Sequence, residues 1–282
     1  MTADRNASWH QAMKGISKLP PFSPVLNRLT GEMAREAVSF AKLAELIETD
    51  AVLAGNVLRV VNSPLYGLRA EVSSVRHAVS ILGLSKLRNI VLSLSVSQLW
   101  NHVRTPAGWS MSHFNRHSLA VAMLADLLAL ETGIEYAEGA FSAGLLHDMG
   151  KLLIAVAFPD QTLAIDRLAG PDWHQANFYE ETVLELSHAE LSAAALTRWN
   201  LPVPIVDGVL NHHTPPAGGR LALANVLYAA DCAANECGHG SRAAVVEGTD
   251  PAAYLAEIGL AQRAESLLDE FHRSFKAIRE FF

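Results

Sequence analysis

The chain is poor in cysteine, in aromatic residues and in charge. Cys232 and Cys237 are the only cysteines among 282 residues, which excludes a disulfide framework and favours reduced thiols. Aromatic residues make up 7% and charged residues 18%, whereas hydrophobic residues reach 50%. This balance excludes disorder and suits helices packed on helices better than a β-sandwich or barrel. The composition therefore predicts an all-α protein with one large core or two smaller ones.

Long hydrophobic runs and an excess of positive charge are also missing. No stretch reaches the roughly 18 consecutive apolar residues of a membrane span, and the first residues lack the apolar centre of a signal peptide. The net charge of −7 argues against broad binding of nucleic acid or of an anionic membrane, although it allows a small basic pocket. We therefore expect a cytoplasmic protein without a membrane partner. The sequence leaves its oligomeric state open.

Apolar residues recur at helical spacing along most of the chain, and this spacing predicts about a dozen helices. Thr49 or Asp50 can cap a helix that ends at Asn62. Glycine and proline between residues 101 and 112 predict a boundary between an N-terminal bundle over 1–108 and a second bundle over 109–282. The other predicted helices cover 75–82, 87–99, 113–131, 137–155, 173–186, 187–199, 203–213, 220–236, 252–259 and 261–281.

Residues of the types that bind metals gather in the second half of the chain, in or beside apolar helices. They are His117, His147, Asp148, His188, His212, His213 and Asp231. A carboxylate in apolar surroundings is unfavourable by several kcal/mol unless it is paired or coordinated, and both Asp148 and Asp231 have such neighbours. A divalent cation would compensate them. Mixed histidine and carboxylate ligands suit Fe, Mn, Zn, Ni or Co better than Ca or Mg.

The local sequence supports these residues but also offers each of them a plain structural role. Ser187 and Glu190 fit a capping box that places His188 in the first turn of a helix, where the positive helix end favours a neutral ring. The pair at 212–213 could instead complement a helix dipole. Lys151, one turn after His147, could form a salt bridge with Asp148 or hold a substrate phosphate. The coincidence of so many positions favours the metal site.

The order of these residues resembles the HD superfamily of metal-dependent phosphohydrolases. Further segments make the chain similar to the HDOD family, the HD-related output domains of bacterial signalling, over about residues 14–235. These segments are LPPFSPVLNRLT, LIETDAVLAGNVLRVVNSPLYG, VSSVRHAVSILGLSKLRNIVLS, FSAGLLHDMGKLL, HAELSAAALTRWNLP and NHHTPP.

The resemblance implies an all-α fold, with an N-terminal helical bundle packed on an HD-type bundle. It implies a signal-transduction module that acts through metal or ligand binding and through a signalling protein partner. The alternative is an active phosphohydrolase or phosphodiesterase that acts on a nucleotide or cyclic dinucleotide, so enzymatic activity is left open.

By motif matching, the resemblance also assigns the site. Asp148 would bridge two metal ions, and Lys151 would contact the substrate phosphate, so these two residues are the catalytic candidates. One or two ions are expected, with Fe or Mn favoured over Zn, Ni or Co. The implied metal ligands are His117, His147, Asp148, His188, His212, His213 and Asp231.

Two departures from the related HD-GYP phosphodiesterases, which cleave cyclic di-GMP, concern substrate and metal count. The segment TPPAGGR after the histidine pair lacks the Gly-Tyr-Pro signature, which argues against recognition of that substrate. One turn before His117 stands His113, where three-metal members have a glutamate. The resemblance therefore leaves the role of His113 and a third metal open.

Overall fold

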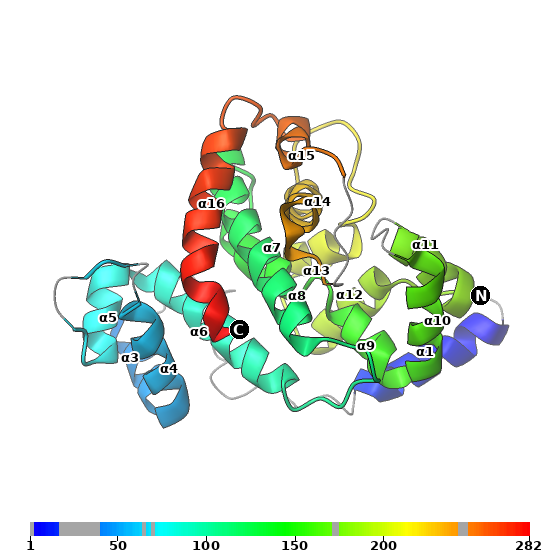
Figure 1. The fold of residues 1–282 in the computed structure, drawn as a ribbon, viewed down its shortest axis with the longest axis horizontal. Helices are drawn as coiled ribbons and strands as arrows, with labels where there is room; N and C mark the ends of the chain where they lie inside the picture. Colours follow the sequence, from blue (N-terminus) through cyan, green and yellow to red (C-terminus); the bar gives the residue numbers. More distant parts are fainter. Residues whose placement is uncertain (1–2, 17–39, 64–65, 69–70, 171–174, 242–247) are drawn as a thin grey trace. The chain divides into compact units, whose positions relative to one another are not determined.

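The regular structure of this chain is helical throughout the part that the computed structural model describes (Figure 1). That part comprises residues 3–16, 40–63, 66–68, 71–170, 175–241 and 248–282. The predicted all-α fold is thus confirmed. The first family-like segment, at residues 19–30, lies outside the described residues.

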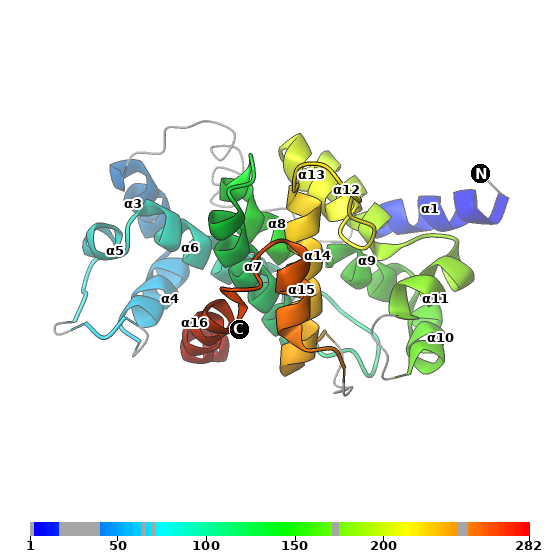
Figure 2. The same ribbon diagram turned by 90° about the horizontal axis from the view of Figure 1, so that it is seen from above.

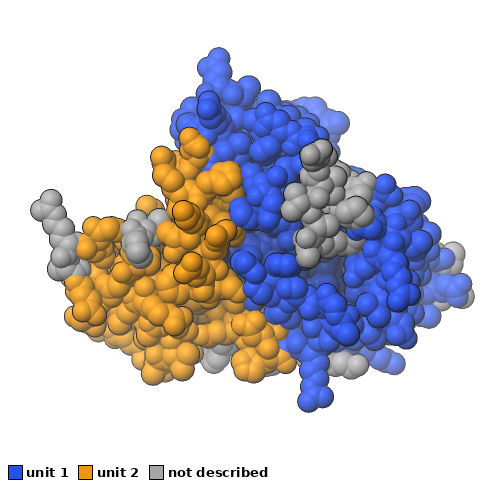
Figure 3. Space-filling view, viewed as in Figure 1, with its two compact units in different colours: residues 1–20, 103–268 blue, residues 21–102, 269–282 orange. Residues whose placement is uncertain are grey.

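The chain divides into two compact units, coloured separately in Figure 3. The larger unit contains residues 1–20 and 103–268, and the smaller unit contains residues 21–102 and 269–282. Each unit therefore combines two segments that are separate in the sequence. The boundary predicted at residue 108 stays a prediction.

The smaller unit packs short helices around buried aliphatic side chains. Its described helices are α3 (Phe40–Glu48), α4 (Ala51–Val61), α5 (Val75–Leu82) and α6 (Leu84–Trp100). Asp50 is the N-cap of α4, where its side chain accepts hydrogen bonds from two backbone amides at 3.0 Å. After α4, the Asn62 amide donates to the Val72 carbonyl at 2.9 Å and accepts from the Val72 amide at 2.8 Å. This pair of bonds ties the C-terminal end of α4 to Val72.

The larger unit contains most of the other described helices. They are α1 (Ala3–Ile16), α7 (Met111–Thr132), η1 (Ala137–Gly139), α8 (Ala140–Leu146), α9 (Met149–Ala157), α10 (Pro159–Ala169), α11 (Gln175–Leu184), α12 (His188–Arg198), α13 (Val203–Leu210), α14 (Leu223–Ala234), the π-helical turn η2 (Asn235–His239) and α15 (Pro251–Glu257). The last helices, α16 (Ala264–Ile278) and η3 (Arg279–Phe281), lead into the C-terminal segment of the smaller unit.

Helices α7, α8 and α14 pack side by side at the centre of the larger unit (Figures 1 and 2). A glycine permits a close approach of α7 and α8, because a Cβ atom on Gly144 of α8 would lie 2.7 Å from the Cα atom of Ala122 on α7. Leu119 and Leu124 of α7 and Leu145 of α8 are buried. The centre of the unit is therefore closely packed.

Two helix predictions were wrong at the places that matter for the site. The helix predicted over 137–155 is interrupted by a turn at His147 and Asp148, which separates α8 from α9. The helix predicted over 203–213 ends at Leu210, and residues 211–213 form a turn. Apolar periodicity continues across a single turn, so the pattern alone does not show the interruption. Helices α1 and α10 were not predicted from the sequence pattern.

The apolar segment Ala137–Ala157 has the length and composition of a membrane-spanning helix, and 83% of its most apolar window is buried. It is, however, broken into α8 and α9 by the turn. It behaves as a core segment of the larger unit.

We expect Gly150→Ala to destabilise the protein by about 3 kcal/mol, because overpacking of this kind is strongly unfavourable. A Cβ atom at Gly150 on α9 would lie 1.9 Å from the carbonyl oxygen of His188 on α12. Chemical unfolding followed by circular dichroism measures the change. The control is Gly55→Ala on α4, where a Cβ atom meets nothing within 4 Å and alanine should be neutral or slightly stabilising. Equal stabilities of the two variants would contradict the close approach of α9 and α12.

Candidate metal centre

Five parts of the larger unit bring the seven predicted ligand residues into one cluster. His117 comes from α7, His147 and Asp148 from the turn after α8, His188 from the first position of α12, His212 and His213 from the turn after α13, and Asp231 from α14. All except His213, which is partly exposed, have at most 2% of their surface accessible. The fold therefore gathers the whole predicted set and buries every member except His213.

Asp148 lies at the centre of the cluster. Its Oδ2 atom is 3.2 Å from His117 Nε2 and 2.6 Å from Lys151 Nζ. Its Oδ1 atom is 3.2 Å from His188 Nε2 and 3.4 Å from His147 Nε2. Asp148 occupies the N-cap position of α9 but makes no side-chain capping bond. Both carboxylate oxygens are consequently directed at the cluster.

Asp231 on α14 supplies a second carboxylate. Its Oδ1 atom lies 3.3 Å from His117 Nε2 and 3.7 Å from His147 Nε2. Asn235, one helical turn after Asp231, donates a hydrogen bond from its side-chain amide to the same oxygen at 2.8 Å. This bond holds the carboxylate in place beside the two rings.

Four of the histidine rings are oriented in the same way, by a hydrogen bond at Nδ1. In His117, His147 and His212, the Nδ1 atom lies 2.6–2.8 Å from a backbone carbonyl oxygen, and in His188 it lies 2.6 Å from Oε2 of Glu180. Since these acceptors require a proton on Nδ1, each Nε2 atom faces the cluster. Histidines that bind metals are usually oriented by such a hydrogen bond on the other ring nitrogen.

Several polar atoms of this cluster are buried without a hydrogen-bond partner. Among the described residues they include His117 Nε2, His147 Nε2, His212 Nε2 and Asp148 Oδ1. Buried polar atoms rarely lack hydrogen-bond partners. Several such atoms at one place are typical of a site that binds a further group. Nitrogen and carboxylate oxygen atoms of this kind fit a divalent transition metal.

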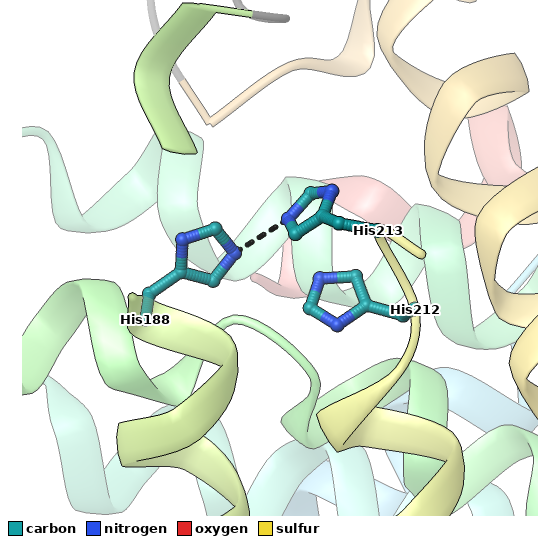
Figure 4. A group of neighbouring side chains, drawn as sticks. All are labelled: His188, His212 and His213. Carbon is teal, nitrogen blue, oxygen red and sulfur yellow. Dashed lines mark hydrogen bonds between the residues drawn. The ribbon is translucent and has the colours of Figure 1, made fainter. Parts of the chain in front are cut away.

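The donor atoms form three groups within which every pair lies within 4.8 Å. These groups are His117, His147 and Asp148; His147, His212 and Asp231; and His188, His212 and His213. The third group is drawn in Figure 4, where the rings of His188 and His213 face one another with a 2.7 Å separation between their Nε2 atoms. One of these two nitrogens must carry a proton when no metal lies between them, because two lone pairs would repel.

The electrostatics separate the cluster into cationic and neutral histidines. Burial opposes charge on His117, but the neighbouring Asp148 and Asp231 outweigh it and raise the pKa of His117 to about 9. Burial likewise opposes charge on His188, whereas Glu180 and Asp148 raise the pKa of His188 to about 9. Without metal, both rings are therefore protonated at neutral pH.

The other groups titrate in the opposite direction or remain ionised. Burial, together with the charges of neighbouring histidines, lowers the pKa of His212 to about 3 and holds the pKa of His213 well below its usual value. Burial would raise the pKa of Asp148, but the charges of His147 and Lys151 outweigh it and hold that pKa well below its ordinary value. At neutral pH, His212 and His213 are therefore neutral and Asp148 is ionised.

A cavity of about 310 Å³ lies beside the cluster in the larger unit. Lys151 lines this cavity, as do Trp109 and His113, whose Nε1 and Nδ1 atoms are buried without a hydrogen-bond partner. The other charged side chains on its wall, Asp166 and Glu180, are acidic. The cavity is thus large enough for a phosphate group but is not uniformly basic. His113 does not belong to any of the three donor groups formed by the described residues.

Sequence reasoning missed Glu180. This carboxylate on α11 is only 4% exposed and accepts hydrogen bonds from both the ring and the backbone amide of His188. In the sequence, it is one of several glutamates in a helical segment, beside the exposed Glu181. No motif or spacing distinguishes the two, so only the packing of α11 identifies Glu180.

The chain belongs to the HDOD domain family, which matches residues 19–215. Among solved structures, it is similar to an HDOD domain protein of unknown function from Geobacter sulfurreducens, with 26% identity, a TM-score of 0.78 and coverage of 98% of this chain and 99% of the other. It is also similar to the MmoQ response regulator from Methylococcus capsulatus, with 28% identity and a TM-score of 0.50 over 89% of this chain and 97% of that one. The family and the fold expected from the sequence are confirmed.

Similarity to a nuclease covers a smaller region. Ribonuclease Y from Thermus thermophilus is 32% identical over 127 residues, which represent 45% of this chain and 17% of that protein. The chain spans about two fifths or less of the length of the curated relatives that it matches.

Proposed function

We propose that this chain is a signal-transduction module of the HDOD family whose larger unit binds a divalent metal centre and presents the bound state to a protein partner. The observation that carries the metal is the convergence of four buried histidines and two buried aspartates, several of whose inward-facing atoms lack hydrogen-bond partners. The signalling context is supported by the similarity to a response regulator. The partner itself and a cytoplasmic location stay predictions.

Two metal positions that share Asp148 are supported by its two oxygens, because Oδ2 lies 3.2 Å from His117 Nε2 and Oδ1 lies 3.2 Å from His188 Nε2. One position would be held by His117 and Asp231, together with His147, whose Nε2 atom lies 3.4 Å from Oδ1 of Asp148 and 3.7 Å from Asp231. The other would be held by His188, His212 and His213, which form one donor group. A bound divalent ion would act as a Lewis acid and lower the pKa of coordinated water. The chain's own contribution is to orient the rings through Nδ1 and to exclude bulk water from the donors.

Elemental analysis by plasma mass spectrometry tests the metal. We expect protein purified without chelator or histidine tag to contain close to two equivalents of a transition metal, with iron or manganese favoured. Anaerobic reconstitution should restore the metal after chelation. Protein that holds no metal even after reconstitution would show that the cluster does not form a metal site.

The second candidate is a phosphohydrolase, and it is favoured by the cavity and by Lys151. The ammonium of Lys151 lies 2.6 Å from Asp148 and lines the cavity of about 310 Å³, where it could neutralise a substrate phosphate. The local similarity to ribonuclease Y supports the same chemistry.

A screen of metal-loaded protein on nucleotides and cyclic dinucleotides tests this candidate. We expect Lys151→Ala to lower any turnover by about 100-fold while the metal content stays unchanged, because one charge on the phosphate is lost. Turnover that is insensitive to Lys151→Ala would remove the residue from the reaction. The exposed Lys86 on α6 provides the control, Lys86→Ala.

A further inference from the structure

Glu180 is a buried carboxylate outside the predicted set of metal ligands. Its side chain is 5% exposed, and a carboxylate in such surroundings needs strong partners. Glu180 is not a member of any of the three donor groups formed by the described residues. The contacts of the residue therefore have to account for its burial.

Glu180 makes two short contacts with His188. The Oε2 atom of Glu180 accepts one hydrogen bond from His188 Nδ1 at 2.6 Å and another from the His188 backbone amide at 2.8 Å. A single oxygen thus holds the ring and the first amide of α12 together. With the proton on Nδ1, the Nε2 atom of His188 faces Asp148 Oδ1 at 3.2 Å and His213 Nε2 at 2.7 Å.

This arrangement differs from that of the other three rings. His117, His147 and His212 are oriented by neutral backbone carbonyl groups, whereas His188 is oriented by a carboxylate. A charged acceptor forms the stronger hydrogen bond and makes the opposite ring nitrogen a better donor to a metal. Of these four rings, His188 is consequently the one with the strongest orienting hydrogen bond.

The start of α12 has a separate support. The Ser187 hydroxyl accepts from the Glu190 amide at 3.2 Å, and Glu190 Oε2 accepts from the Ser187 amide at 3.1 Å, which completes the predicted capping box. Arg5 of α1 forms an ion pair with Glu190. Loss of the Glu180 carboxylate should therefore release the ring of His188 while the helix start stays in place.

We propose that Glu180 is a positioning residue of the metal centre, which fixes the Nδ1-protonated form of His188 and directs Nε2 at the position held by His188, His212 and His213. This inference rests on the proposed metal binding. Glu180 acts through His188 and does not itself ligate the metal.

Metal titration of three variants tests the proposal, with Co²⁺ as a visible probe and a chelator as competitor. We expect Glu180→Ala to weaken binding of one of the two ions by about 10–100-fold and to change the Co²⁺ absorption spectrum. Glu180→Gln keeps an acceptor oxygen and should recover most of the affinity. Glu181→Ala, at the exposed neighbouring position, should bind as the wild type does.

A double-variant cycle separates positioning from a general structural effect. In the His188→Ala background, the additional Glu180→Ala change should have almost no effect on metal affinity, because the residue acts only through that ring. In the Zn²⁺-loaded wild type, long-range ¹H–¹⁵N correlation should show a proton on His188 Nδ1.

Three results would overturn the proposal. They are an unchanged affinity and spectrum in Glu180→Ala, an equal loss of affinity with and without His188, and a proton on Nε2 of His188 in the Zn²⁺-loaded protein. In each case the wild type still binds metal, so the proposed function survives. A wild type that binds no metal at all would overturn both.

Discussion

Asp148→Ala is expected to lower the metal affinity of the larger unit by more than about 100-fold, the upper end of the loss for residues that only support a ligand. Asp148 is the residue whose two oxygens face different histidines, His117 on one side and His188 on the other. Its removal therefore affects both proposed metal positions. Chelator competition and elemental analysis of the purified protein measure the loss.

The stability of this variant has to be followed as well. Without Asp148, the ammonium of Lys151 loses its 2.6 Å partner, and removal of one member of a buried pair is unfavourable by about 3–5 kcal/mol. Asp148→Asn keeps the shape of the side chain and serves as the second variant, with the helical signal in circular dichroism as the check of folding. The exposed Asp269 on α16 gives the control, Asp269→Ala. Wild-type metal content in both Asp148 variants would contradict its central role.

Raising the pH from 7 to 8 is expected to tighten metal binding by about 100-fold. The pKa values of His117 and His188 are raised to about 9 in the metal-free protein, so both rings carry an extra proton in this range. A metal binds only the deprotonated nitrogen, and each released proton contributes about tenfold per pH unit. Above pH 9 the dependence should flatten, because the rings are then already neutral.

The same pKa shifts have the opposite effect on the metal-free fold. A folded-state pKa of about 9 lies above the unfolded value of 6.5, so this contribution to stability is fully present below pH 6.5 and is lost as the pH rises through 9.

The protons released on metal binding are counted by calorimetric titration with Zn²⁺ in buffers of different ionisation enthalpy. If the metal affinity is equal at pH 7 and pH 8, the rings of His117 and His188 are not protonated in the metal-free protein.

Local chemistry determined much of this protein before tertiary structure was considered. The low aromatic content and the helical periodicity predict an all-α chain, which the described residues confirm. The caps of α4 and α12, at Asp50 and Ser187, follow from short-range preferences and are present. The chemical types of the seven metal-ligand candidates are also visible in the sequence, because Asp148 and Asp231 stand in apolar surroundings.

Tertiary packing decided how these residues meet. The turn at His147 and Asp148 and the end of α13 before His212 interrupt patterns that continue in the sequence. The inclusion of α1 in the same compact unit as α7–α15 depends on contacts between residues far apart along the chain.

The orientation of the rings was likewise outside the reach of sequence. The proton on Nδ1 of His117 is placed by the carbonyl of His239, 122 positions away, and only the burial of α11 separates Glu180 from the exposed Glu181. Helix propensity and capping act over a few residues, whereas ligand geometry depends on which distant atoms share a dry interior. For this reason the sequence determined the donor types and the helices, and the tertiary structure decided the site.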